Sequence, residues 1–281
     1  MMPAMFMRTR PVEGAPSLAL DSTSLALDYE RISATRQFES GKRLADDLGI
    51  GPGERVLDVG CGTGLLANHI AELVGREGRV LGIDPLPLRI GLAASRAHDN
   101  LSFELGDAYD LDGLPDKSFD VVVLNAVFHW LPEKTGPLLA FGRVLRAGGR
   151  IGISTGLKGH LTQFQTVLRA VLAEPPFDRY PRLRESITFR VGADEMRALF
   201  QTTGFMPVHI EVRESERHHP SAEAAVRFVE ASSFGNVFGH LPPELKDRAH
   251  DRLRQALETI AETDGNIVVN ARRLVAIGER R

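Results

Sequence analysis

Two apolar runs joined by a glycine-rich turn constrain the fold of this chain more than any other feature. Residues 56–64 read Val-Leu-Asp-Val-Gly-Cys-Gly-Thr-Gly, and a second apolar run ends at Asp84, twenty residues after Gly64. Such a pattern is typical of a strand, a tight turn and a helix that together hold a nucleoside. Glycine lets a ligand approach the backbone more closely than a Cβ would permit. The pattern predicts a nucleoside site in which Asp84 binds the ribose hydroxyls.

The glycine spacing separates two classes of nucleoside ligand. A dinucleotide turn reads G-x-G-x-x-G and directs helix amides at a pyrophosphate, whereas Gly60, Gly62 and Gly64 follow the pattern G-x-G-x-G after Asp58. The Asp58 carboxylate would repel a pyrophosphate and attract an ammonium group. A turn that merely happens to be rich in glycine is the alternative, and the spacing of Asp58 and Asp84 makes it much the weaker one.

With Asp58, Gly60, Gly62 and Gly64 the chain matches the motif (D/E)-x-G-x-G-x-G, and it resembles the class I S-adenosylmethionine-dependent methyltransferases. The resemblance implies an α/β fold, a Rossmann-like doubly wound sheet of seven strands in the order 3-2-1-4-5-7-6. It also implies that S-adenosyl-L-methionine is the methyl donor and that the glycine loop wraps its methionine and ribose parts.

Further residues of the expected cofactor site follow other strands. By the resemblance, Asp107 after the third strand accepts a hydrogen bond from the adenine amine, and the Ala108 amide serves a ring nitrogen. Pro85, directly after Asp84, belongs to the same site. Asn125, at the end of the fourth strand, would face the methionine part of the cofactor.

Two candidates for catalysis stand near these residues in the sequence. His129 could remove a proton from a hydroxyl, carbon acid or amine acceptor, or it could simply pack beside Trp130. Tyr29 and Arg36 lie on an N-terminal helix of the kind that closes the cofactor pocket in small-molecule members of the family. Tyr29 alternatively anchors the tail to the core.

Short apolar strands alternate with helices over most of the chain, which predicts a parallel sheet covered on both faces. We expect residues 1–27 to form a tail or lid and residues 28–281 a single methyltransferase domain. Two segments, 156–190 and 213–265, interrupt the pattern and are expected to be helical caps over the substrate. The last two strands are expected over 205–212 and 267–277.

Composition narrows the range of partners. A net charge of −3 and a pI near 6.3 give no general attraction for nucleic acid or anionic lipid. Cys61 is the single cysteine, which excludes a disulfide framework and a cysteine metal cluster, and we expect no metal. Charged residues interrupt the apolar N-terminus before a membrane span could form. We therefore expect a cytoplasmic protein acting on a small-molecule acceptor; the oligomeric state is left open.

The acceptor is the least constrained part of the prediction. The run Asn125-Ala-x-x-His-Trp130 is similar to trans-aconitate O-methyltransferases and quinone-pathway C-methyltransferases. The methylated atom, O, N, S or C, stays open. A NAD-dependent oxidoreductase, which Asp84 would also suit, and a catalytically silent protein that binds S-adenosylmethionine are the alternatives.

Overall fold

Seven strands form one mixed sheet in the computed structural model, which describes residues 15–181 and 187–281. Their order is β3-β2-β1-β4-β5-β7-β6, as predicted. The first five pair in parallel, and β7 runs antiparallel to both of its neighbours. The strands are β1 (Arg55–Val59), β2 (Arg79–Asp84), β3 (Leu101–Leu105), β4 (Phe119–Asn125), β5 (Leu145–Gly156), β6 (Phe205–His219) and β7 (Ile267–Arg280).

Helices cover both faces of the sheet, because successive strand residues point to opposite sides and both sides are apolar. On one face Leu57 packs with side chains of α5 and α7. On the other face Val56 packs with side chains of α2 and α3. The helices around the main sheet are α2 (Ala34–Leu48), α3 (Leu65–Val74), α4 (Pro87–Ala93), α5 (Thr135–Val144) and α7 (Ala193–Thr202). Two short helical turns accompany them, η3 (Ala94–Arg96) and η4 (Phe128–Trp130).

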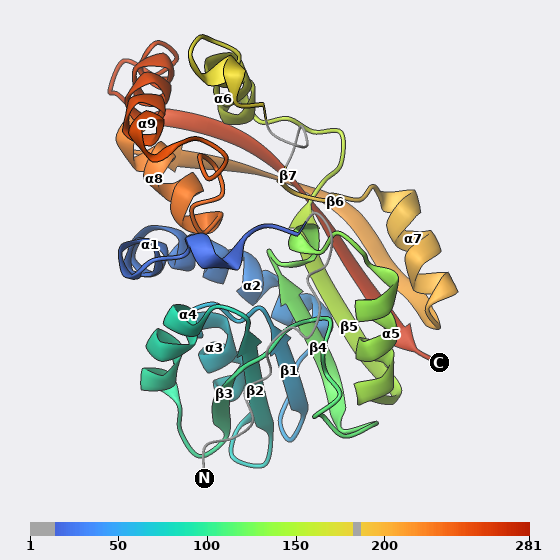
Figure 1. The fold of residues 1–281 in the computed structure, drawn as a ribbon. Coiled ribbons are helices and arrows are strands. Elements are labelled where there is room, and N and C mark those ends of the chain that lie inside the picture. The colour runs from blue at the N-terminus through green and yellow to red at the C-terminus, as the bar shows by residue number, and fades with distance from the viewer. Residues whose placement is uncertain (1–14, 182–186) are drawn as a thin grey trace.

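The β6–β7 hairpin extends well beyond the rest of the sheet and carries the cap (Figure 1). Helices α8 (Ala222–Ser232) and α9 (Pro243–Glu258) connect its strands, and α6 (Gln163–Leu172) packs against α9. The turn η5 (Phe177–Arg179) follows α6. These elements share a third apolar core, which includes Phe164, Ala249 and Val269. The cap therefore has its own packing, separate from the two faces of the main sheet.

The end of β6 differs from our prediction. The strand expected to end at Val212 continues to His219, which pairs with Ile267 of β7. Residues 213–219 are rich in charge and look like a loop by hydropathy. They stay extended because β7 pairs with them along their whole length. Residues 213–219, expected in the second cap segment, therefore belong to the sheet.

The N-terminal segment lies between the sheet and the cap (Figure 1). It comprises η1 (Leu18–Leu20), α1 (Thr23–Asp28) and a π-helical turn η2 (Tyr29–Ser33), which leads into α2. The Ser22 side chain caps α1 by accepting a hydrogen bond from the Leu25 amide. Part of the expected tail or lid is thus helical; residues 1–14 lie outside the described residues. None of the helices in the described ranges combines the length and apolar character that a membrane crossing requires.

Candidate functional site

The glycine turn between β1 and α3 is tied to the end of β2 by hydrogen bonds. The Gly62 N–H donates to Asp84 Oδ2 at 2.9 Å, and the Leu86 N–H donates to Asp84 Oδ1 at 2.9 Å. Gly62 has a φ of +58°, a value that glycine adopts at little cost. The predicted turn and the predicted ribose-binding acid are therefore brought together, and the acid itself holds the turn in shape.

Two buried acids give this end of the sheet a negative charge. Asp58 is 2% exposed and Asp84 is 6% exposed. Burial, followed by repulsion from Asp84, raises the pKa of Asp58 to about 7. Asp58 Oδ2 and Thr63 Oγ1 are buried and accept or donate no hydrogen bond within the described part of the chain. A ligand that hydrogen-bonds these two buried atoms would supply the partners they lack. The negative charge of the two carboxylates favours a ligand with a positive group.

The expected adenine-binding residues lie next to the ribose-binding acid. Asp84 pairs with Leu105 at the ends of β2 and β3, and the Gly106 N–H donates to the Asp84 carbonyl at 3.1 Å. Asp107 and Ala108 follow directly and are buried. The Asp107 carboxylate accepts a hydrogen bond from the Tyr109 amide.

Pro85 is half-buried in the bend between Asp84 and α4. It therefore lies at the same edge of the sheet as the acid that precedes it.

Tyr29 covers the glycine turn. A Cβ built on Gly62 would lie 3.1 Å from the Tyr29 ring, and the Arg89 guanidinium stacks 4.0 Å from the centre of that ring. The cavity left beside the turn measures about 30 Å³ and is lined by Tyr29, Asp58, Gly60 and Asn125 among others. That volume is far smaller than a nucleoside, and Tyr29 fills much of the space over the turn in this structure.

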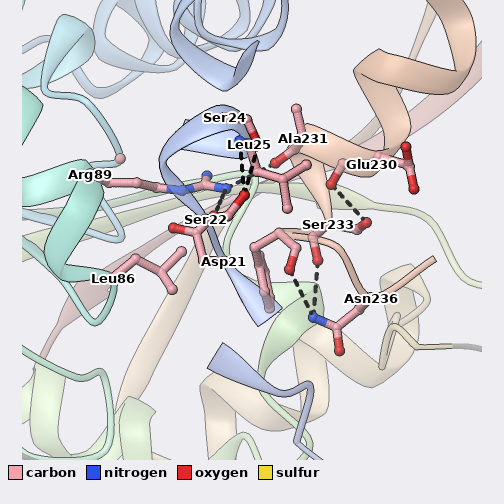
Figure 2. A network of polar contacts seen from close by, with 12 residues as sticks. Asp21, Ser22, Ser24, Leu25, Leu86, Arg89, Glu230, Ala231, Ser233 and Asn236 are labelled. Atoms are coloured by element: carbon pink, nitrogen blue, oxygen red, sulfur yellow. Dashed lines mark hydrogen bonds and ion pairs between the residues drawn. The ribbon is translucent and has the colours of Figure 1, made fainter. Parts of the chain in front are cut away.

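Arg89 links the N-terminal segment, which carries Tyr29, to the cap. Figure 2 shows Arg89, from α4, beside Asp21 of the N-terminal segment and Ala231 of α8. Its guanidinium donates to the Ala231 carbonyl at 2.9 Å and lies 3.8 Å from the buried Asp21 carboxylate. The N-terminal segment is thus held between the main sheet and the cap.

Asn125 and His129 stand at the end of β4, as predicted. Asn125 donates to the Gln37 carbonyl at 2.7 Å, and its Oδ1 accepts a hydrogen bond from Arg273 at 3.2 Å. His129 Nδ1 lies 3.0 Å from Thr155 Oγ1, and its ring is 4.9 Å from the Trp130 ring. Between them Ala126 has a φ of +62°, a strained value for a residue with a Cβ, and strain of this kind concentrates at functional sites.

The protonation of His129 follows from its surroundings. Burial and then the positive charges of Arg190 and Arg273 hold the pKa of His129 well below its usual range. The imidazole is therefore neutral at pH 7 and able to accept a proton.

Comparison with known proteins shows which proteins this chain is similar to. Residues 50–175 match a methyltransferase domain family. The chain is 28% identical to an uncharacterised methyltransferase of Schizosaccharomyces pombe, over 89% of this chain and 95% of the relative. It is also 28% identical to a demethylmenaquinone methyltransferase of Staphylococcus aureus, over 66% of this chain and 84% of the relative. A methyltransferase structure from Bacillus halodurans shares the fold, with a TM-score of 0.58 and 16% identity over 86% of this chain and 99% of that one.

Residues 50–175 thus carry a methyltransferase domain, and the sheet has the strand order expected for a class I S-adenosylmethionine-dependent methyltransferase. S-Adenosylmethionine is the donor that this family uses, and the residues at the glycine turn fit it. The unsatisfied Asp58 Oδ2 and Thr63 Oγ1 can receive polar groups of the ligand, and the buried acids suit its positive charge. Within residues 15–181 and 187–281, no three His, Cys, Asp or Glu side chains are grouped so that they could hold a metal ion.

The methyltransferase has a second, larger cavity of about 490 Å³ between the sheet and the cap. His129 and Trp130 line it, together with one face of the β6–β7 hairpin and residues of α2, α6 and α8. Arg36, expected at the cofactor, lines this cavity instead. It hydrogen-bonds the His219 ring at 3.3 Å and the His218 carbonyl.

Of the eight arginines that line this cavity, only Arg36 was among the predicted site residues. The others include Arg190, Arg217 and Arg273. A signal existed in the alternation of residues 213, 215, 217 and 219, which share one face of a strand. It was missed because this stretch was expected to be part of the cap and not of the sheet.

Proposed function

We propose that this methyltransferase binds S-adenosylmethionine across the glycine turn and methylates a small molecule held in the larger cavity. When bound, the cofactor supplies a methyl group that forms a bond to the acceptor's nucleophilic atom, while the electron pair of the broken S–C bond stays on sulfur. The observation that carries the proposal is the buried acid pair Asp58 and Asp84 around a turn that has unsatisfied polar atoms.

Each residue at the turn has a role in this proposal. Asp84 accepts hydrogen bonds from the ribose hydroxyls with the lone pairs that Gly62 and Leu86 leave free. Asp58 attracts the amino group of the methionine part. Asp107 and the Ala108 amide, with Pro85 beside them, bind the adenine.

Asn125 contacts the methionine part from the opposite side. It lines the small cavity at the turn and also hydrogen-bonds Arg273 of the larger one, so it lies where donor and acceptor would meet. Tyr29 closes the site after the cofactor enters. Exclusion of water and alignment of the two reactants supply most of the rate enhancement in this type of transfer.

His129 acts as the general base in this proposal whenever the acceptor carries a proton on its nucleophilic atom. Its ring lines the acceptor cavity, Thr155 orients Nδ1, and the neutral imidazole can accept the proton. An acceptor that is already ionised would not need this step.

Calorimetric titration with S-adenosylmethionine, S-adenosylhomocysteine and NAD tests the cofactor part. We expect both sulfur compounds to bind and NAD to fail, because two buried acids oppose a pyrophosphate. Tight binding of NAD alone would overturn the assignment. Incubation with methyl-labelled cofactor and a metabolite extract tests the transfer itself, and labelled cofactor that binds but passes no label to any acceptor would favour a silent binding protein.

A further inference from the structure

The larger cavity carries an unusual amount of positive charge. Eight arginines line it, and four half-buried ones have no ion-pair partner among the described residues: Arg36, Arg190, Arg217 and Arg273. Most buried arginines in proteins are paired, because an unpaired charge out of water is costly.

The hydrogen bonds of these arginines all go to neutral atoms. Arg273 donates to Ser154 Oγ at 2.9 Å, to the Ser154 carbonyl at 2.8 Å and to Asn125 Oδ1. Arg190 donates to the His160 carbonyl at 3.1 Å, while its Nε is buried and unsatisfied among the described residues. Within the same residues the Arg217 side chain makes no hydrogen bond at all.

Several other charged residues at this cavity form ion pairs. Arg213 pairs with Asp47 at 2.7 Å, and Arg272 pairs with Glu214 at 2.7 Å. The two remaining acids on the lining, Glu39 and Glu216, are exposed and pair with Lys42 and His218. Counted over the described residues, the lining therefore carries more positive than negative charge.

The arginines also repel one another. Burial and then the charge of Arg217 lower the pKa of Arg273 to about 9, and burial followed by Arg36 and Arg190 lowers the pKa of Arg217. All of them remain charged at pH 7. An arrangement that gathers like charges without a counterion costs folding free energy, and a bound anion would recover it.

The cavity also has apolar lining residues. Phe164 and Leu168 of α6, Val237 after α8 and Val269 of β7 line it and are buried in the cap core. A volume near 490 Å³ falls in the usual range for small-molecule sites. The cavity thus combines guanidinium groups, one of which contacts Asn125, with apolar side chains of the cap.

We propose that the methyl acceptor is an amphipathic organic anion, whose carboxylate or phosphate binds Arg217 and Arg273 and whose apolar part lies against Phe164 and Leu168. This rests on the proposed function in that the larger cavity is taken as the acceptor site. Arginine binds both kinds of oxyanion through paired N–H groups, so the shared chemistry is a planar or tetrahedral oxyanion. Because Arg273 hydrogen-bonds Asn125, the charged end of the acceptor is the end nearest the cofactor.

The experiment measures binding of four eight-carbon probes to the full chain saturated with S-adenosylhomocysteine: octanoate, octyl phosphate, octanol and octylamine. We expect the two anions to bind and the alcohol and amine to bind at least about tenfold more weakly, as the loss of a charge-assisted hydrogen bond implies. The tighter of the two anions distinguishes a carboxylate acceptor from a phosphate acceptor.

Three variants locate the effect. R217Q and R273Q are each expected to weaken anion binding about tenfold. R280Q, from the same hairpin but outside the cavity lining, is expected to leave it unchanged. R217Q removes no hydrogen bond within the described residues, so it should fold normally, which a thermal melt verifies.

Several results would overturn the inference. Octanol or octylamine could bind as tightly as the anions, or R217Q and R273Q could leave anion affinity unchanged. Weakening of S-adenosylhomocysteine binding by the same factor would instead assign these arginines to the cofactor's carboxylate. Failure of the proposed function would give another result. Anions would still bind in a way that depends on Arg217, but no acceptor would receive a methyl group.

Discussion

The two cavities of this methyltransferase carry opposite charge. Asp58 and Asp84 make the glycine turn acidic, whereas Arg36, Arg190, Arg217 and Arg273 make the cap-side cavity basic. The acids lie at the ends of adjacent parallel strands, and three of the arginines lie on β6, β7 and the segment before α7. The fold thus separates an acidic cavity from a basic one, and Asn125 contacts both.

His129 stands at that junction, and its removal should produce the largest effect. His129→Gln is expected to lower kcat about a hundredfold, the lower end for loss of a general base, while the Kd for S-adenosylmethionine stays unchanged. Single-turnover rates and calorimetry separate the two quantities. An unchanged kcat would exclude His129 from the chemistry and indicate an acceptor that is already ionised.

The acidic site should depend most strongly on Asp84. Asp84→Asn removes a charge and places an amide where two N–H groups now converge, so we expect about 2–3 kcal/mol weaker binding of S-adenosylmethionine, roughly thirty- to hundredfold. Calorimetric titration of the purified variant measures this loss.

Asp120 provides a matched control for Asp84. It is also buried, at 7% exposed, and accepts a hydrogen bond from the Arg55 amide at 2.7 Å, but it lies at the amino end of β4. Asp120→Asn should reduce thermal stability and leave cofactor affinity intact. Equal losses of affinity in the two variants would mean that Asp84 acts through stability alone.

The charge of Asp58 predicts how cofactor binding responds to pH. Its pKa of about 7 in the free protein means that below pH 7 the carboxyl must lose a proton before it can attract an ammonium. We expect the Kd for S-adenosylmethionine to rise by up to about tenfold per pH unit below 7. The slope should disappear in Asp58→Asn, and a slope that persists there would belong to another group.

In the free protein the effect of Asp58 on stability has the opposite sign. Its folded pKa of about 7 exceeds the ordinary value of 3.8, so the folded state keeps a proton that the unfolded state loses between these values. The free energy of unfolding contributed by Asp58 therefore falls as the pH rises from about 4 to 7. Melts of wild type and Asp58→Asn across this range isolate the contribution.

The acidic and basic sites also differ in how well the sequence predicts them. The acidic site comes from short segments in which each residue has a fixed offset from a strand end, such as Asp58 before the turn and Asp84 after β2. Local patterns of this kind predict placement well, because strand and turn geometry are set by neighbouring residues. The strand order followed from the family resemblance, and the sheet has that order.

The basic site could not be predicted in the same way. Arg217 and Arg273 are far apart in the chain and come together because β6 and β7 pair in register, while Arg190 is brought there by the segment before α7, where Val191 bridges Leu157. The stretch around Arg217 lacks the apolar alternation that marks a strand, so its pairing depends on β7 and not on its own propensity. Arg36 shows the same difficulty: its helix was expected, but the neighbour that it contacts, His219, comes from this unpredicted part of β6.

The smallest effect we expect concerns the segment that covers the acidic site, and two glycines isolate it. Gly62 and Gly53 both have positive φ values, +58° and +83°, but a Cβ on Gly62 would meet Tyr29 at 3.1 Å while one on Gly53 would meet nothing within 4 Å. Both alanine variants should lose about 1–2 kcal/mol of stability from the backbone strain alone. Only Gly62→Ala should also weaken S-adenosylmethionine binding, by roughly three- to tenfold, because Tyr29 must move away from the turn. If Gly53→Ala weakens binding equally, the strain and not the contact with Tyr29 is responsible, and the covering segment takes no part in holding the cofactor.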